Sequence, residues 1–269
     1  MDDEARESPG VGGNTYAGSP PMVGLGRFDE FEVVCRGEVS ASPGYLIDIK
    51  VIDRAVRDVV VPRLKVLSDN PAAADPAGFL GSLVSPVDAW IRSAVGGSGA
   101  RLDTIRWRLT PYYSIECSTD RPMHAQLRQR FDFAASHRLH VPSLSPDENR
   151  RLFGKCNHPS GHGHNYQFEL AVNVPLSGEG GHGLLARIER EAKAAVLDRF
   201  DHTHLNLDTE EFRDGSGVNP TVENIAWVIF SLLEPRIRGL GPGVALDTVT
   251  VWETDRTCAT VGRDDRARR

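Results

Sequence analysis

The chain has 269 residues, of which 40% are hydrophobic and 25% are charged, and its formal net charge is -6 at pH 7. This composition is typical of a globular protein, and the negative charge argues against a nucleic-acid partner while still allowing a local basic pocket for a small anion. No apolar run approaches the roughly 18 to 20 residues of a membrane helix, and no apolar stretch follows the acidic start, so we expect neither a membrane partner nor a secretory signal.

The four cysteines are scattered and form no C-x-x-C pair; they are Cys35, Cys117, Cys156 and Cys258. Such spacing favours reduced thiols over a disulfide framework. We therefore expect a cytoplasmic protein, either an enzyme or a small-molecule binder.

The first half of the chain predicts a small unit of strands and helices. Residues 1–21 are rich in Gly, Pro, Ser and Asp and are expected to form a disordered tail. A strand, two helices and a strand-like hairpin interrupted by Pro111 are then predicted, over residues 28–38, 49 to 62 or 67, 85–95 and 102–117. Residues 70–81 are expected to form a loop and residues 96–99 a linker.

The second half predicts a similar series. Strands, helices and strands again are expected over residues 131–135, 165–174, 185–196, 221–233, 246–251 and 258–261. Residues 263–269 are charged and are expected to fray.

A short internal repeat links the two halves. Leu-Asp-Thr-Ile at 102–105 resembles Leu-Asp-Thr-Val at 246–249. We therefore expect two tandem units, and the predicted division is 22–117 for the first unit, 118–128 for a linker, 129–262 for the second unit and 263–269 for a charged tail. The first unit contains no histidine, so the chemistry is expected in the second.

Eight of the nine histidines lie between His137 and His204. His162 and His164 are two residues apart, so on a strand their side chains point to the same face. A third nitrogen from His137, at the end of a neighbouring strand, would complete an arrangement typical of catalytic zinc, with one position open. On spacing alone, His140 and His158 are equally eligible, and ordinary surface histidines remain an alternative.

Three further polar positions are candidates for chemistry. An isolated cysteine is more often a small buried hydrophobe, but beside a metal or a histidine Cys156 would favour its thiolate and could act as a base or a nucleophile. The Asp201-His202 step could tune such a thiol, or could simply end a helix. Glu253 ends the last strong strand, where it could accept hydrogen bonds from an amide-like group or be an ordinary exposed carboxylate.

Five segments occur in an order that resembles a known family. They are FDFAASHRL at 131–139, LFGKCNHPSGHGHNY at 152–166, FDHTHLN at 200–206, PTVEN at 220–224 and VWET at 251–254. Together they resemble the 6-pyruvoyltetrahydropterin synthase family, which also includes the 6-carboxytetrahydropterin synthases. The first unit is similar to the later portion of that family but lacks its zinc and cysteine segments.

The resemblance implies the α+β tunnelling fold, an antiparallel sheet with two helices on one face. It implies a homo-oligomer whose subunits join their sheets into a barrel, with active sites at subunit or repeat boundaries. It assigns Zn2+ to His137, His162 and His164.

The resemblance also implies roles for the remaining candidates. It assigns the base to Cys156, supported by Asp201 and His202. It assigns pterin recognition to Glu253, with help from two residues of the fourth segment, Thr221 and Glu223. Leu109 stands where alignment of the halves would put Glu253, so we expect no pterin pocket in the first unit.

The implied substrate is dihydroneopterin triphosphate. Zinc would acidify C–H groups beside its side-chain oxygens, a thiolate would remove the proton, and triphosphate would leave. Arg138 and Lys155, beside the ligand and the base, are predicted triphosphate contacts.

The gap of five residues between Cys156 and His162 resembles the pyruvoyl-forming synthases. The alternative is a 6-carboxytetrahydropterin synthase of queuosine and deazapurine synthesis. Two other classes remain open: a non-catalytic pterin or purine binder, and a structural module in which zinc only holds the hairpin.

Overall fold

The computed structural model describes residues 29–42, 44–69, 75–96, 99–176 and 183–268. The predicted tail at 1–21 therefore lies outside the described residues. No helix in the described part of the chain has both the length and the apolarity that crossing a lipid bilayer requires.

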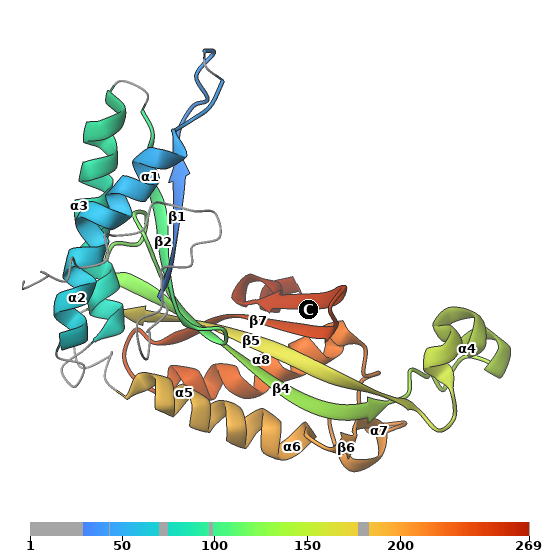
Figure 1. Cartoon of the computed structure of the whole chain (residues 1–269). Coiled ribbons are helices and arrows are strands. Elements are labelled where there is room, and N and C mark those ends of the chain that lie inside the picture. Colours follow the sequence, from blue (N-terminus) through green and yellow to red (C-terminus); the bar gives the residue numbers. More distant parts are fainter. Residues whose placement is uncertain (1–28, 43, 70–74, 97–98, 177–182, 269) are drawn as a thin grey trace, which may run out of the picture.

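The strands form one eight-stranded sheet in the order β1-β2-β3-β4-β5-β7-β8, and β6 pairs with β4 (Figure 1). All pairs are antiparallel except β4 with β6. The strands are β1 Glu30–Arg36, β2 Arg101–Thr110, β3 Tyr113–Ser118, β4 His124–His137, β5 His162–Pro175, β6 Thr203–His204, β7 Ala245–Thr254 and β8 Thr257–Gly262. The predicted α+β class with an antiparallel sheet is confirmed.

The helices pack on the sheet in two groups. In the first half, α3 contacts β2 and β3, and in the second half, α8 contacts β7 and β8. The helical segments are α1 Ile49–Ala55, η1 Val56–Val60, α2 Val61–Asp69, α3 Pro76–Val95, α4 Pro146–Phe153, η4 Gly154–Asn157, α5 Leu184–Ala192, η5 Lys193–Leu197, α6 Asp198–Phe200, α7 Leu205–Asp208, α8 Val222–Arg238 and η6 Arg263–Arg268.

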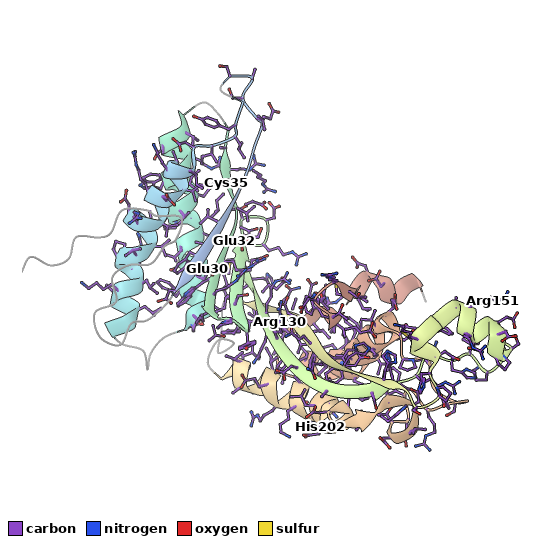
Figure 2. All side chains as sticks on the ribbon, turned by 45° about the vertical axis from the view of Figure 1, so that its right-hand side comes forward. Glu30, Glu32, Cys35, Arg130, Arg151 and His202 are labelled. Carbon is purple, nitrogen blue, oxygen red and sulfur yellow. The ribbon has the colours of Figure 1, made fainter. Side chains whose placement is uncertain are left out.

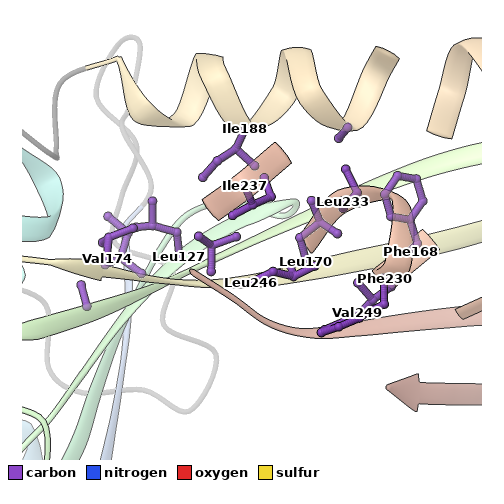
Figure 3. Packing of buried hydrophobic residues seen from close by; sticks show 14 of the residues in the cluster. Leu127, Phe168, Leu170, Val174, Ile188, Phe230, Leu233, Ile237, Leu246 and Val249 are labelled. Carbon is purple, nitrogen blue, oxygen red and sulfur yellow. The ribbon is translucent and has the colours of Figure 1, made fainter. Parts of the chain in front are cut away.

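The core lies between these helices and the sheet. Leu170 on β5 and Val249 on β7 are fully buried in the same cluster as Leu233 and Phe230 of α8 (Figure 3). Burying one such side chain stabilises the fold by about 1.5–3 kcal/mol. This apolar layer holds β4, β5 and β7 in place, and these strands carry the candidate site.

The helix predicted to begin at Ser85 begins instead at Pro76. The side chain of Asp75 caps it by accepting a hydrogen bond from the N–H of Ala77. Pro76 is tolerated at the first helical position because a backbone N–H there would have no partner within the helix. A buried stripe continues past Pro86, which lies inside the helix; it comprises Leu80, Leu83, Val84, Val87 and Ile91. Burial of this stripe outweighs the cost of about 3 kcal/mol for an internal proline, so the loop prediction was wrong from residue 76 onward.

Three other boundaries differ from the predictions. The first helix continues past Pro62 to Asp69, because Pro62, which has no backbone N–H to donate, lies where the π segment η1 passes into α2. The predicted linker at 118–128 includes the first residues of β4. The tail predicted to fray forms η6 over residues 263–268, where Arg263 donates a hydrogen bond to the carbonyl of Leu246 at 3.1 Å.

Candidate metal and catalytic site

The three predicted metal ligands lie together at one end of the sheet. The antiparallel pairing of β4 and β5 sets His137 opposite His162, and alternation along β5 puts His164 on the same face. Their ligand atoms lie within 4.8 Å of one another. Small side-chain movements would bring these three residues, the histidine trio, onto one ion with bonds of about 2.0–2.1 Å.

Several nitrogen atoms of the histidine trio are poorly satisfied by protein groups. Nε2 of His164 and Nδ1 of His162 are buried and have no hydrogen-bond partner. Nε2 of His137 faces Nε2 of His162 at 3.1 Å. Because a buried unpaired polar group costs about 1–3 kcal/mol, the residues present fit a bound cation.

His137 is held in the form that binds a metal. Its Nδ1 lies 2.7 Å from the carbonyl oxygen of Pro220, which can only accept, so Nδ1 carries the proton and Nε2 keeps its lone pair. Burial lowers the pKa of His137 to about 4 and also lowers the pKa of His162. Both imidazoles are therefore neutral at pH 7.

Glu253 and Tyr166 adjoin the histidine trio. Oε1 of Glu253 lies 3.4 Å from Nε2 of His137 and 3.5 Å from Nε2 of His164. The hydroxyl of Tyr166 lies 3.3 Å from Nδ1 of His137, and Glu253 is close enough to act on its pKa. Burial, followed by the charge of Glu253, raises the pKa of Tyr166, so this hydroxyl stays protonated. The predicted pterin contact of Glu253 stays a prediction, and the structure places its carboxylate against the imidazoles.

Cys156, the predicted base, is half-buried in η4. Its backbone carbonyl accepts a hydrogen bond from the N–H of Leu139 at 2.9 Å, which ties η4 to the chain just beyond β4. A charge on Cys156 contributes to the raised pKa of Tyr166. The thiol therefore lies within electrostatic reach of Tyr166, whose hydroxyl is 3.3 Å from Nδ1 of His137.

Asp201 and His202 form a pair on the surface beside β4. Oδ1 of Asp201 lies 2.9 Å from Nδ1 of His202 and accepts from the N–H of Ala134 at 2.9 Å; the Ala134 bond is the main reason that the pKa of Asp201 is lowered. His202 has a φ of 58°, which is costly for a residue with a side chain. His202 borders the same surface hollow of about 460 Å³ as His164.

The Asp201-His202 pair faces solvent. The His202 side chain is 82% exposed (Figure 2). Among the residues that the structure describes, no hydrogen bond or ion pair joins Asp201 or His202 to Cys156. The structure therefore brings the pair together but does not place it against the predicted base of the same chain.

Thr221 and Glu223 begin α8 close to the histidine trio. The Thr221 hydroxyl caps the helix by accepting from the N–H of Asn224 at 3.4 Å, and Glu223 is exposed in the first turn. The carbonyl just before them, that of Pro220, orients His137. Substrate contacts of Thr221 and Glu223 stay predictions.

Arg138 and Lys155 line one cavity of about 660 Å³, and His162 lines it too. The side chain of Asn206 fixes the backbone of Arg138, accepting from its N–H at 2.8 Å and donating to its carbonyl at 3.1 Å. The sequence pattern did not identify Asn206, because its partners are backbone groups distant along the chain. Tyr166 was also missed, although its place two residues after His164 puts it on the histidine face.

Comparison with known proteins places this site inside a described family. Residues 126–264 match the family model described as 6-pyruvoyl tetrahydropterin synthase, and this is more than half of the chain. The human protein named 6-pyruvoyl tetrahydrobiopterin synthase is 38% identical over 136 residues, which are 50% of this chain and 89% of that protein. The Drosophila melanogaster protein of the same name is 36% identical over 115 residues, 42% of this chain and 67% of that protein.

A solved structure of Caenorhabditis elegans 6-pyruvoyl tetrahydropterin synthase is 33% identical, covers 52% of this chain and 95% of that chain, and has a TM-score of 0.46. The matched residues 126–264 contain every candidate site residue described above. The chain therefore belongs to the 6-pyruvoyl tetrahydropterin synthase family.

Proposed function

We propose that the chain is a zinc-dependent 6-pyruvoyltetrahydropterin synthase, a lyase that converts dihydroneopterin triphosphate to 6-pyruvoyltetrahydropterin with release of triphosphate. The observation that carries the proposal is the histidine trio, with Glu253 against it, in a chain 38% identical to the human protein of that name. Neutral imidazoles, a carboxylate and a nearby thiol supply the ligands, the acceptor and the base that this reaction needs.

The donor set favours zinc. Three imidazole nitrogens suit zinc, whereas magnesium and calcium prefer oxygen ligands. His137, His162 and His164 would hold the ion. Bound there, zinc would supply Lewis acidity, which would make C–H groups of the substrate side chain more acidic.

The residues around the histidine trio have separate tasks. Cys156 takes the proton from the side-chain carbon. Glu253 recognises the pterin by accepting hydrogen bonds from its ring N–H and amino group. Thr221 and Glu223, at the start of α8, contribute to pterin binding.

The Asp201-His202 pair acts in a site shared between copies of the chain. Its geometry is fixed by Ala134, yet His202 is exposed and has no contact with Cys156 in the described part of its own chain. A catalytic pair that is oriented but lacks its thiol fits a homo-oligomer in which the adjoining copy supplies Cys156. The pair then tunes that thiol as a base.

The first half is a second unit of the same fold that has lost the site. When residues 102–105 are aligned with 246–249, two sheet irregularities coincide. The register of β1 with β2 shifts between Val34 and Cys35, and the register of β5 with β7 shifts between Ala171 and Val172. These two shifts fall at aligned places on β2 and β7. The hairpin registers of β2–β3 and β7–β8 shift at aligned places too, between 108 and 110 and between 252 and 254. Because bulges are inherited features of a fold, this coincidence supports a duplication.

The helices support the same duplication. The first helix of each half contains a five-residue π segment, η1 or η5. Leu109 takes the aligned place of Glu253, so the first unit lacks the acidic group as well as the histidines. We propose that this unit is a scaffold: its β3 covers the edge of β4, a place that a single-unit relative would fill with another subunit.

The test is incubation of zinc-loaded protein with dihydroneopterin triphosphate, without a reductase, and identification of the products by mass spectrometry. The proposal expects a pyruvoyl tetrahydropterin and free triphosphate. A carboxy tetrahydropterin with acetaldehyde would replace it with the deazapurine enzyme. Binding of the substrate without turnover would make the protein a pterin binder.

A further inference from the structure

A cavity lined by arginines lies where the two halves of the sheet join, on the face opposite the core; Arg130 marks this place in Figure 2. Its volume is about 330 Å³, and its lining comes from β2, β3, β4 and β5 and from the turn between β2 and β3. Four arginines line this arginine cavity and only one carboxylate does; they are Arg106, Arg108, Arg128, Arg130 and Glu169. We propose that the arginine cavity binds a phosphate group of a small molecule, at a second site separate from the histidine trio.

Strand alternation puts the four arginines on one face of the sheet. On β2 and on β4 they flank the buried Trp107 and Gln129, so their side chains point away from the core. His137 lies seven residues beyond Arg130 on β4, on the opposite face and about 23 Å away along the strand. An anion in the arginine cavity therefore does not compete with a ligand at the histidine trio.

A small side chain separates two of the arginines. Ser114 on β3 pairs with Arg108 on β2 and with Arg128 on β4, so the three residues form one row across the strands. Because neighbouring strands lie about 4.8 Å apart, the backbones of the two arginines are about 9–10 Å apart. This separation leaves room for a phosphate group between two guanidinium groups, beside the hydroxyl of Ser114. The planar fork of arginine matches the oxygens of a phosphate.

Two of the arginines share a single carboxylate. Arg128 donates from Nη1 to Glu169 at 3.2 Å, and Arg130 donates from Nη2 to the same carboxylate at 3.4 Å. The Nε atoms of both arginines are buried and have no hydrogen-bond partner in the described part of the chain. Since each guanidinium has five N–H donors, and a buried donor without an acceptor is costly, a bound phosphate would supply acceptors that the protein does not.

The two arginines of β2 have partners that lie outside the lining of the cavity. Arg106 pairs with Glu116 and Glu32, which hold its side chain at the wall. Arg108 meets Glu30 at 3.3 Å and Glu32 at 3.6 Å, and these three side chains are all more than 40% exposed. Exposed ion pairs contribute little and exchange readily, so Arg108 is available to an anion.

The donors of β4 are oriented before any ligand arrives. The guanidinium of Arg130 lies over the ring of Trp252, 4.5 Å from its centroid, which fixes this side chain against the sheet. Glu169 holds Arg128 beside it. Because little side-chain freedom is then lost on binding, the arrangement favours tight binding of an anion.

The test is isothermal titration calorimetry of the zinc-loaded protein with inorganic pyrophosphate. Arg128→Gln removes one donor and leaves Glu169 its other arginine partner, so it should weaken binding about tenfold, as expected for the loss of one charge-assisted hydrogen bond. Arg36→Gln is the matched control, because Arg36 is an arginine of β1 that pairs with Asp120 and does not line the arginine cavity. Pyrophosphate that binds elsewhere or extracts zinc contributes equally to all variants, so the differences report the cavity.

Ser114→Asp tests the charge balance of the arginine cavity without an added ligand. A carboxylate between Arg108 and Arg128 takes the place proposed for the phosphate, so this variant should lose the pyrophosphate binding of the cavity. Relative to the neutral variant Ser114→Asn, its melting temperature should rise by about 2–4 °C. A lower melting temperature than that of Ser114→Asn would mean that the arginines are already neutralised, and would overturn the proposal.

ADP separates two sources of the phosphate group, because it carries the diphosphate as an ester. Binding of ADP that is lost in Arg128→Gln would assign the site to a phosphate ester, whereas binding of pyrophosphate alone would assign it to a free diphosphate. Equal pyrophosphate binding by wild-type, Arg128→Gln and Ser114→Asp proteins would overturn the proposal. Loss of self-association in Arg128→Gln, with pyrophosphate binding unchanged, would also overturn it, because carboxylates of a second copy would then be the partner of the arginines.

Discussion

Removal of the metal should leave the protein folded but measurably less stable. The histidine trio brings its ligand atoms within 4.8 Å of one another and leaves Nε2 of His164 and Nδ1 of His162 buried without hydrogen-bond partners. A metal that binds this site in the folded state only shifts the folding equilibrium by mass action. At free zinc about 100 times the dissociation constant, the free energy of unfolding rises by about 2.7 kcal/mol.

This free energy corresponds to a readable change in melting temperature. For a chain of this size, about 1 kcal/mol shifts the midpoint by about 2–4 °C, so saturating zinc should raise it by about 5–11 °C. Differential scanning calorimetry of chelator-treated protein, with and without zinc, measures the shift. His162→Asn removes one ligand and should abolish most of it.

His158→Asn provides the matched control, because His158 is exposed just before β5, four residues before His162, and lies outside the histidine trio. It should keep the full zinc-dependent shift. The reasoning fails if His162→Asn and His158→Asn melt with the same zinc-dependent shift. Complete unfolding of the metal-free protein at 25 °C would instead support a structural zinc module.

Three further outcomes are expected. The folded-state pKa of His137 is about 4, below the usual 6.5 of the unfolded chain, so acid protonates the unfolded state first. In urea titrations of the metal-free protein, the free energy of unfolding should therefore fall by up to about 3 kcal/mol as the pH is lowered from about 6.5 to 4. It should change little above about pH 6.5. Gly161 and Gly215 both have a positive φ (69° and 84°), but only at Gly161 would a Cβ lie 2.9 Å from the carbonyl oxygen of His137. Gly161→Ala should therefore cost more stability than Gly215→Ala and should also weaken zinc binding. Equal melting temperatures of the two variants would contradict this. Cys156→Ala should lose turnover and keep zinc and substrate binding, whereas Cys258→Ala should keep turnover, as measured by triphosphate release; an active Cys156→Ala would remove the thiol from the mechanism.

Hydrophobic periodicity predicted most of the sheet and its helices. Alternation along β5 and the apolar stripe of α8 gave elements that the structure confirms, with longer boundaries. The errors came where burial outweighs local propensity, as in α3, whose apolar stripe continues across Pro86. Helix α4 was not predicted, although Ser145 and Glu148 carry a capping signal.

The candidate site was predictable to the extent that its residues share a short motif. His162 and His164 lie two residues apart, and strand geometry predicts their common face. The Pro220 carbonyl that orients His137, and the side chain of Asn206 that holds the next residue, come from segments far along the chain. Such contacts depend on the tertiary structure, so no local pattern predicts them.

A zinc titration of metal-free protein tests the central claim most directly, with triphosphate release from dihydroneopterin triphosphate as the readout. The account predicts no release without zinc, a rise in rate as zinc is added, and saturation at one zinc per chain, because the described residues contain a single histidine trio. Release that proceeds at full rate in the metal-free protein, or that persists with zinc in His162→Asn, would contradict it.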